Sequence, residues 1–498
     1  TRINLAGANV DASGLGNRAL CTIAFQDHAH TDRIVDPYLS GRTWDPLSPD
    51  RGSFWSRWAV RNKYRQNALV KIYEGYEGQN LADMQSRSYF IDSLQGPDSA
   101  GRVVIKGKDI LVRLEERKSQ APLASPGVLF EDIDELATSF VVAGAVASDY
   151  PIPEGYGAVR IGDEIIYFTS RELTEDGLIL SGLTRGADGT VAEAHSVDDV
   201  VQRCLVYADE PIGSVLINLL GFFGRIPFRF LDLAQWAQEI NEYLGFYRLN
   251  AVISDPVSVT QFISEIQVSV GCFLWWDERA AKVRLKAVRG VDTEPPTITD
   301  NAHIIAGSFS LKEMPRERIS QVWFYYSQRT PVGGLEDESN FDNVFIAADL
   351  PSETEEQYGD PSIRKIYSRW INTAALAQTT AVKIISLYVD TPSQVTFEMD
   401  AKDREYWIGD NFYISHYLDV DAFGERRLRQ WTVTSAEEVV PGERVRYVCA
   451  DTTLYGRIYV IQEDGAADYD PSVTYFNEAF IGDDDGLLSD GTLSARIA

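Results

Sequence analysis

Apolar and polar positions predict strands in the first quarter of the chain. The runs 68–73 and 103–105 are rich in Val, Ile, Leu and Tyr, and turn-forming segments at Glu74-Gly75 and 96–98 separate them. The pattern closes at Gln120-Ala121-Pro122, after which a Pro- and Ser-containing stretch follows. We therefore expect a β-rich first domain over residues 1–122.

A second β-rich region is expected over residues 301–462. A strict alternation over 393–400 puts Val395, Phe397 and Met399 on one side of a strand, which is typical of a strand with one buried face. A single helix is expected over 371–387, ending before Pro392. The later strands are predicted over 411–416, 428–434 and 444–449. This pattern indicates a barrel or a sandwich.

The period changes to that of a helix after Pro211. Helices are predicted over 231–244 and from Ser258, a plausible N-cap, to Val270. A hairpin is expected to follow, with strands over 272–276 and 283–288 and a turn at Asp277-Glu278-Arg279. The apolar run 212–230 is interrupted by polar residues and Pro227, so it indicates a buried core or an interface and no membrane span. We expect a small α/β module over 211–300.

Short strands alternate with turns between residues 123 and 210. Gly186, Gly189 and Thr190 resemble part of a phosphate cradle, but no GxxxxGK[ST] motif is present and the neighbourhood is acidic. A turn whose glycines adopt positive φ is the preferred interpretation. The segment is expected to form an inserted β-rich module.

The net charge of −28 is distributed unevenly and argues against direct binding of nucleic acid. Residues 123–210 hold 17 acidic and 4 basic side chains, and residues 463–498 hold 9 and 1. Residues 1–122, by contrast, carry a net charge of +3. We expect the acidity to lie on appendages, where it favours solubility. The N-terminus does not resemble a secretory signal, which favours assembly in a cytoplasm.

Nucleophilic and metal chemistry has weak support in the sequence. The cysteines Cys21, Cys204, Cys272 and Cys449 are far apart, without a CxxC motif, and are interpreted as small buried hydrophobic residues. A Cys/His pair such as Cys272 with His416 has no local motif behind it. The segment from Asp27 to Asp32, which contains His28 and His30, is a candidate metal loop, but a solvated loop is favoured.

Two further motifs have simpler interpretations than the chemistry they suggest. Trp275-Trp276 suggests a sugar-stacking platform, but adjacent side chains of a strand point to opposite faces, so core packing is favoured. The same geometry argues against catalysis by Asp163/Glu164 or Asp277/Glu278. The segment 483–486 lacks the alternating acids of a calcium loop and is interpreted as part of an acidic tail. No catalytic, cofactor-binding or metal-binding residue is therefore predicted.

The order of several motifs resembles the tail-tip or baseplate hub proteins of long-tailed, siphovirus-like bacteriophages. The resemblance covers most of residues 67–490, whereas residues 1–66 match poorly. It is carried by the segments 70–75, 89–92, 96–98, 101–105, 108–109, 120–122, 161–166, 183–190 with His195, 272–289, 390–392, 400–403, 407–410 and 457–459.

This resemblance implies an α+β, mainly β, multidomain fold. It would contain two tube-type β-barrel domains (1–122 and 301–462), the inserted β-rich module (123–210), the small α/β module (211–300) and an acidic C-terminal extension (463–498). Three copies would close into a pseudo-sixfold ring that ends the tail tube. The implied partners are the distal tail protein, the tape-measure protein, the tail tube and central fibre proteins. The implied location is the distal end of the tail in the virion.

Two other functions remain open from the sequence. A receptor-binding adhesin of the tail tip would use the 123–210 module or Trp276 to meet a host surface. A cell-wall hydrolase is suggested only by scattered acids and His416. A non-enzymatic, structural homotrimer without a cofactor is the preferred interpretation.

Overall fold

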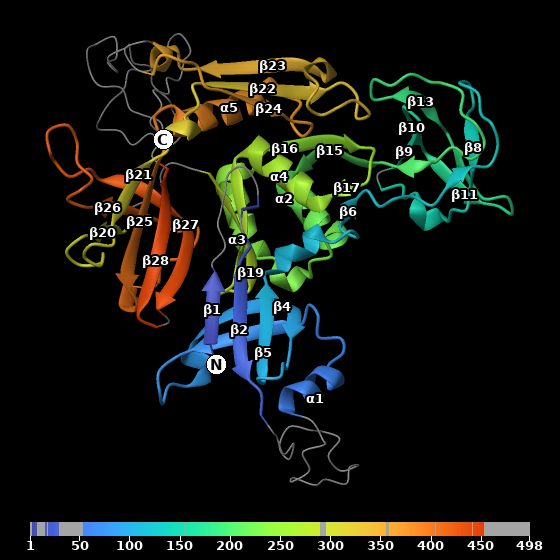
Figure 1. The fold of residues 1–498 in the computed structure, drawn as a ribbon. Helices are drawn as coiled ribbons and strands as arrows, with labels where there is room; N and C mark the ends of the chain where they lie inside the picture. Colours follow the sequence, from blue (N-terminus) through green and yellow to red (C-terminus); the bar gives the residue numbers. More distant parts are fainter. Residues whose placement is uncertain are drawn as a thin grey trace, which may run out of the picture.

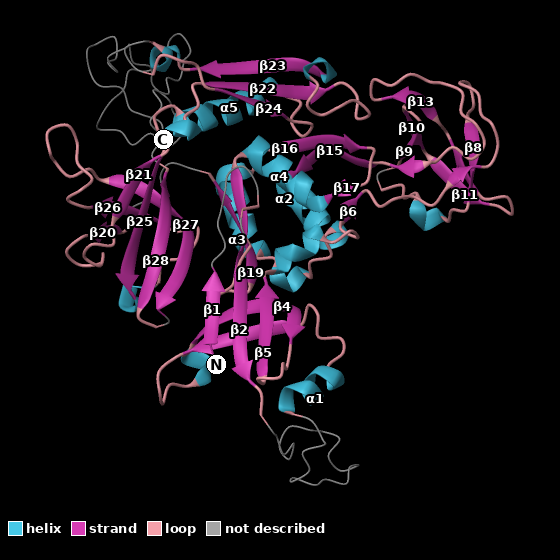
Figure 2. Cartoon of the chain, viewed as in Figure 1, coloured by secondary structure: helices cyan, strands magenta, loops and turns pink. Residues whose placement is uncertain are grey.

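The protein has a mainly β fold with several sheets and a helical centre (Figures 1 and 2). The computed structural model describes residues 2–6, 15–16, 18–28, 53–153, 155–288, 295–354, 358–403, 405–440 and 442–452. The expected α+β, mainly β, multidomain class is confirmed. The expected segments 457–459, 463–498 and 483–486 lie outside the described residues.

The first sheet is an antiparallel half-barrel in the order β1-β2-β5-β4-β3. Residues 69–74 alternate between exposed and partly buried positions, as expected of its edge strand. A short helix, α1 (Phe54–Arg61), lies beside this sheet. The strands are β1 (Arg2–Ala6), β2 (Leu20–Gln26), β3 (Leu69–Glu74), β4 (Gln85–Gln95) and β5 (Arg102–Lys108).

The second half-barrel is six-stranded, in the order β20-β26-β27-β28-β25-β21. Val395, Phe397 and Met399 are fully buried, which confirms the face predicted from their alternation. Only the β20–β26 pair is parallel. The strands are β20 (Thr297–Thr299), β21 (Ser310–Glu313), β25 (Ser393–Asp400), β26 (Asn411–Ser415), β27 (Arg429–Val440) and β28 (Arg444–Asp451).

Neither sheet closes on itself among the described residues, so the two expected barrels are open half-barrels in a single chain. Closure of a barrel requires the first and last strands to pair, and here each terminal strand has one neighbour. The strand pattern predicted the strands correctly but carries no information about closure.

Helices and small sheets fill the space above the first half-barrel (Figure 1). Two of the helices continue into a π-helical turn, Asn218–Phe223 after α2 and Ile240–Leu244 after α3. The elements are β6 (Gln120–Ala121), β15 (Leu205–Pro211), α2 (Ile212–Ile217), α3 (Leu233–Glu239), β16 (Arg248–Ile253), β17 (Val257–Ser258), α4 (Val259–Val270), β18 (Cys272–Asp277), β19 (Lys282–Ala287), β22 (Gln321–Gln328), β23 (Phe341–Ala348), β24 (Ile363–Tyr367) and α5 (Ala374–Tyr388).

The predicted helices and hairpin of this region are present. Helix α4 begins directly after Ser258, although the Ser258 side chain makes no capping hydrogen bond. It ends at Gly271, whose φ of 72° favours glycine. Helix α5 packs against β22 and β23. The apolar run 212–230, expected to be buried, supplies α2 and the π-helical turn after it.

The inserted module forms two four-stranded sheets, β13-β10-β9-β14 and β11-β12-β8-β7. It has a hydrophobic core of its own and projects to one side (Figure 1). Its strands are β7 (Val128–Leu129), β8 (Ser139–Ala143), β9 (Gly157–Ile161), β10 (Glu164–Phe168), β11 (Ser170–Leu173), β12 (Leu178–Ser181), β13 (Thr184–Ala187) and β14 (Gln202–Arg203). Gly186 and Gly189 have φ of 59° and 72°, as expected of turn glycines.

A single continuous core joins the rest of the described chain, from Leu15 to Cys449. It includes both half-barrels and the helical centre. Burial alone does not divide this core, so the domain boundaries drawn from the sequence remain a prediction. Among the described residues, every helix is too short or too polar to cross a bilayer.

Candidate functional site

The hairpin β18–β19 contacts both half-barrels, and we call this junction the seam. The indole Nε1 of Trp276 donates to the carbonyl oxygen of Ser88 on β4 at 3.0 Å. The Ser88 backbone N–H in turn donates to the Glu278 carbonyl oxygen at 2.8 Å. On the other side, Lys286 of β19 donates to the carbonyl oxygen of Gly409 in the second half-barrel. The hairpin therefore ties together two sheets from opposite ends of the chain.

Gly409 is a site of close approach within the seam. Its φ is +88°, and a Cβ built there would lie 2.6 Å from a ring carbon of Trp275. Non-glycine residues are strained in this backbone region, and the indole leaves no room for a side chain. The glycine thus lets the second half-barrel pack directly on the hairpin.

A buried ion-pair network crosses the seam. Arg87 of β4 pairs with Glu74 of β3 at 2.7 Å and also with Glu438 of β27. The side chains of Arg87 and Glu438 are each only 2% exposed. Burial alone would raise the pKa of Glu438, but the hydrogen bond and charge of Arg87 lower it below the usual value. The pair is ionised in the folded protein at neutral pH.

The expected turn at Asp277-Glu278-Arg279 is present, and Glu278 and Arg279 lie inside the seam. Glu278 is 1% exposed, and burial raises its pKa to about 7. The guanidinium of Arg279 lies 3.6 Å from the ring centroid of Trp407, and burial lowers its pKa to about 10. The turn is buried because the second half-barrel covers it, which the hairpin sequence does not indicate.

The inserted module has its own charged centre at Glu164. Arg185 donates to both Glu164 oxygens at 2.8 Å, and His195 Nε2 lies 2.8 Å from Oε2. Two backbone N–H groups, of Gly186 and Glu193, also donate to this carboxylate. Burial would raise the pKa of Glu164, but these hydrogen bonds lower it to about 2. All four contacts hold the turn over 183–195 against β10, so the cluster has a structural role.

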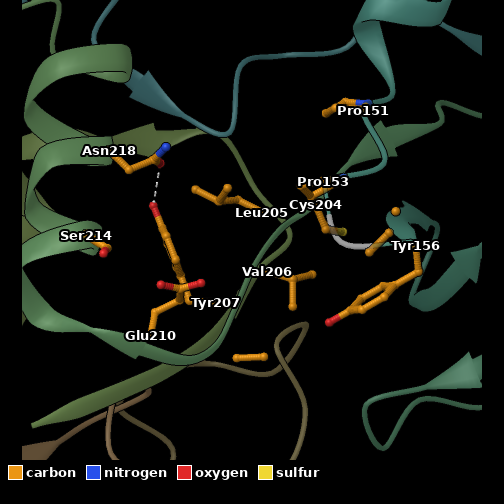
Figure 3. A pocket seen from close by; sticks show the side chains of 13 residues that line it. Pro151, Pro153, Tyr156, Cys204, Leu205, Val206, Tyr207, Glu210, Ser214 and Asn218 are labelled. Atoms are coloured by element: carbon orange, nitrogen blue, oxygen red, sulfur yellow. Dashed lines mark hydrogen bonds between the residues drawn. The ribbon is translucent and has the colours of Figure 1, made fainter.

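A cavity of about 300 Å³ lies where the inserted module meets the helical centre (Figure 3). Pro151, Pro153 and Tyr156 of the module face Tyr207 and Asn218 across it. The Tyr207 hydroxyl donates to Asn218 Oδ1 at 2.8 Å, as the dashed line shows (Figure 3). The cavity combines aromatic walls with few polar groups, so it resembles a gap between packed units more than a reaction centre.

Cys272 and His416, the candidate nucleophile pair, both have packing roles in the structure. Burial raises the pKa of the Cys272 thiol to about 12, so it is not a thiolate at neutral pH. His416 stacks on Phe309 with ring centroids 3.8 Å apart, and its Nδ1 accepts from the Leu418 N–H at 3.1 Å. Burial also lowers the pKa of His416. Each of these residues is held in a packing role.

The other predictions about single residues have mixed outcomes. Cys21, Cys272 and Cys449 are buried as expected, but Cys204 is only partly buried because it borders the cavity. Trp275 and Trp276 are both buried, so the sugar-platform hypothesis for Trp276 is wrong.

The candidate metal loop has a structural contact of its own. Residues His30 and Asp32 of this loop lie outside the described residues. Asp27, which belongs to the loop, accepts from the Trp55 backbone N–H at 3.0 Å and so helps to fix α1. No group of three His, Cys, Asp or Glu side chains suited to a metal ion is present within the described part of the chain.

Sequence reasoning missed the residues of the seam. Arg87 and Glu438 are separated by 351 positions, and neither belongs to a recognisable motif. The one available signal was an arginine between two serines directly before the apolar run Tyr89-Phe90-Ile91, at Ser86-Arg87-Ser88. Such an arginine is buried only when it is paired.

No family model matches the chain, and no curated protein matches its sequence. Its fold is similar to a tail protein from Neisseria meningitidis MC58, with a TM-score of 0.40 and 10% identity over 91% of this chain and 98% of that one. It is also similar to the 43 kDa tail protein of prophage MuSo2 from Shewanella oneidensis, with a TM-score of 0.40 and 8% identity over 91% and 95% of the two chains.

A third similarity is to a chain in the virion of a native gene transfer agent particle, with a TM-score of 0.32 and 9% identity over 80% of this chain and 88% of that one. These three proteins are tail or virion proteins. The sequence motifs resemble the same class of protein. Similarity at this level concerns the arrangement of the chain and assigns no role to a residue.

Proposed function

We propose that the chain is a structural protein of a bacteriophage tail that acts as a trimeric hub at the distal end of the tube. The seam carries this proposal: one chain holds two open half-barrels, drawn from its beginning and its end, in a fixed relation through the hairpin β18–β19. Three such chains present six half-barrels. A closed ring of this kind needs heterologous contacts that repeat around an axis.

Open sheet edges also favour a role in assembly. Strand β3 at one end of the first sheet and β21 at one end of the second have a single neighbour each among the described residues. Edge strands present backbone N–H and C=O groups that pair readily with another chain. In the proposed ring, such edges and the sheet faces beside them meet the next copy.

The proposed hub connects the sixfold tube to threefold parts below it. Its partners are the tail tube, the distal tail protein, the tape-measure protein and central fibre proteins, and it carries out no catalysis. It assembles in the host cytoplasm and resides in the virion.

Cross-linking of intact particles tests the trimer. An amine-reactive cross-linker is applied to particles, and the products are separated under denaturing conditions and detected with an antibody to this chain. The proposal expects a ladder that ends at three times the 55.7 kDa of one chain. A ladder that continues to six copies, or a single monomer band beside a cross-linked tube protein, would contradict it.

The inserted module favours a second candidate function, receptor binding at the tail tip. The module has a separate core, projects from the body of the protein and carries much of the negative charge (Figure 1). Its two connections to the body lie together, because the Val201 N–H donates to the Gly127 carbonyl oxygen at 3.0 Å. Residues 128–203 can therefore be replaced by a short Gly/Ser linker while β15 stays intact.

Assembly and host adsorption of particles with this replacement distinguish receptor binding from a role in the hub. If the module is the adhesin, particles assemble normally and fail to adsorb to host cells. If the module does not bind the receptor, particles assemble and adsorption is unchanged. A loss of assembled tails would show that the module is needed for the hub itself and would contradict the adhesin.

A further inference from the structure

An open groove runs along the face of the first half-barrel beside α1. It has a volume of about 520 Å³. Trp55 and Trp58 of α1 form one wall, and Val70, Ile91 and Ile105 from three neighbouring strands lie at its floor. No residue of α1 is buried, and Tyr64 just after the helix is 98% exposed. Within the described part of the chain, half-buried tryptophans and the aliphatic side chains beneath them thus line the groove.

Helix α1, which forms one wall of the groove, is held in place by several contacts. The Phe54 N–H donates to the His28 carbonyl oxygen at 2.9 Å, and the rings of Phe25 and Trp55 are 4.6 Å apart. At the other end, Arg65 Nη1 donates to the carbonyl oxygens of Ala59 at 2.9 Å and Asn62 at 3.1 Å. These contacts fix α1 on the sheet, so the groove exists before anything binds to it.

The groove has a positive rim in a strongly negative protein. Residues 53–73 contain five Lys and Arg residues and no Asp or Glu, whereas the whole chain carries −28. Arg61 and Lys63, which line the groove, are exposed. Cations beside half-buried tryptophan favour an occupant that carries carboxylates next to aromatic or aliphatic side chains.

The chain itself contains such a segment. Residues 463–498 hold nine acidic residues and one basic residue. Their apolar side chains come in pairs, at Tyr475-Phe476, Phe480-Ile481 and Leu487-Leu488, and Asp483-Asp484-Asp485 lies between the last two pairs. The segment is therefore complementary to the groove: its acidic residues match the basic rim, and its apolar pairs match the aromatic and aliphatic lining.

The length of chain beyond the described residues is sufficient to reach the groove. The described chain ends at Thr452, directly after β28, in the half-barrel whose β27 contacts β1 of the first half-barrel. From Thr452 to Phe476 the chain can span roughly 80 Å when extended, at about 3.3–3.6 Å per residue.

We propose that the acidic C-terminal segment 463–498 binds in the groove between α1 and the first half-barrel. Its aromatic pairs occupy the surface beside Trp55 and Trp58, and its carboxylates face Arg61 and Lys63. The contact ties the end of the chain to its beginning. When the segment comes from a neighbouring copy, it links the subunits of an oligomer.

Site-specific photo-cross-linking of the full-length protein tests this proposal. The photoreactive residue p-benzoylphenylalanine replaces Tyr64, beside the groove, or Leu136, which is 80% exposed on the inserted module and serves as the control position. After irradiation, cross-linked peptides are identified by mass spectrometry. We expect the Tyr64 probe, and not the Leu136 probe, to cross-link to residues 463–498.

Charge reversal gives the second arm of the experiment. Arg61→Glu with Lys63→Glu is expected to reduce the yield of this cross-link at least fivefold, and Asp483, Asp484 and Asp485 changed to Lys in that background are expected to restore it. The matched control, Lys118→Glu with Lys312→Glu, changes the same charge at exposed positions away from the groove and should leave the yield unchanged.

Mixing heavy-isotope and unlabelled copies shows whether the bound segment belongs to the same chain or to a neighbour. Either origin supports the proposal. Tyr64 cross-links that reach only other parts of the chain or another protein would overturn it, as would a yield that does not respond to the Arg61/Lys63 reversal. Circular dichroism of each variant confirms that the fold is retained.

Discussion

Arg87 on β4 and Glu438 on β27 form a buried ion pair although 351 positions separate them in the sequence. Together with the two hydrogen bonds between the hairpin β18–β19 and β4, this pair joins the first and last sheets of the described chain. A buried ion pair adds little stability over an apolar contact, but it is costly to break and therefore selects one arrangement of the two sheets.

Removing Arg87 should destabilise the protein strongly. Arg87→Met leaves the Glu438 and Glu74 carboxylates without their cation, and we expect a loss of about 3–5 kcal/mol in the free energy of unfolding. Denaturant unfolding followed by tryptophan fluorescence measures it. The matched control is Lys108→Met on the same sheet, whose pair with Asp92 at 3.2 Å is about one-third exposed; its cost should be below about 1 kcal/mol. Equal losses would contradict the role of the seam pair.

Glu278 should make the protein less stable as the pH rises. Burial raises its pKa in the folded protein from 4.5 to about 7, so the folded state favours the protonated acid. Its stabilising contribution is complete below about pH 4.5 and is lost as the pH rises through about 7. The difference in the free energy of unfolding is on the order of 3 kcal/mol.

Glu278→Gln should remove this dependence and be more stable than the natural protein at pH 8. The measurement is denaturant unfolding at pH 4.5, 6, 7 and 8. Glu443→Gln, at an exposed position of the second half-barrel, should follow the natural protein at every pH. If the free energy of unfolding varied with pH in the same way for Glu278→Gln and the natural protein, Glu278 would be ionised in the folded protein at no cost in stability.

Glu164 should have the opposite effect on stability: the inserted module should become less stable as the pH falls. The rest of the protein should not be affected. Its pKa is lowered to about 2, so its contribution is complete above about pH 4.5 and is lost as the pH falls toward 2. Glu164→Gln leaves Arg185 buried without its partner, and a local loss of about 3 kcal/mol or more is expected at pH 7. Hydrogen exchange should accelerate over residues 128–203 and stay unchanged in β27 and β28.

The control for Glu164 is its neighbour Asp163, whose side chain is 87% exposed. Asp163→Asn should leave hydrogen exchange in the module unchanged. If Glu164→Gln also had no effect, the network around Glu164 would not be what holds the turn over 183–195.

Adding a side chain at Gly409 should destabilise the protein, because the backbone there lies close to Trp275. Gly409→Ala combines the strain of a positive φ, about 1–2 kcal/mol, with a clash against Trp275. Gly424 has a similar φ of +83° and open space where an alanine Cβ would lie, so Gly424→Ala isolates the strain. We expect Gly409→Ala to lower the free energy of unfolding by about 1–3 kcal/mol more than Gly424→Ala, which is the usual cost of overpacking. Equal losses would mean that the hairpin can move away from Gly409.

Local patterns predicted local structure well. The period of Phe262, Ile266 and Val270 predicted α4, and the alternation at Val395, Phe397 and Met399 predicted the buried face of β25. Both signals arise within one element, where the spacing of side chains is set by the backbone. Helix α1 was missed because it is only eight residues long, so its apolar face, Trp55 with Trp58 and Ala59, gives a single repeat that does not distinguish a helix from a loop.

The seam could not be predicted in the same way. Glu278 and Arg279 have the sequence of a turn. Glu278 is buried and Arg279 partly buried because a half-barrel about 130 positions later in the chain covers them. Trp276 is buried for a related reason: its indole meets Ser88 of the first sheet. Contacts between distant segments depend on how whole sheets pack, and a single sequence does not encode that packing locally.

The hub proposal is tested most directly by an electron cryo-microscopy reconstruction of the tail end of the particle, at a resolution that allows this chain to be traced. The account predicts three copies in a ring below the tube, with both half-barrels of each copy in the ring and the inserted modules outside it. Copies found only on peripheral fibres, or six copies that each contribute one half-barrel, would contradict it.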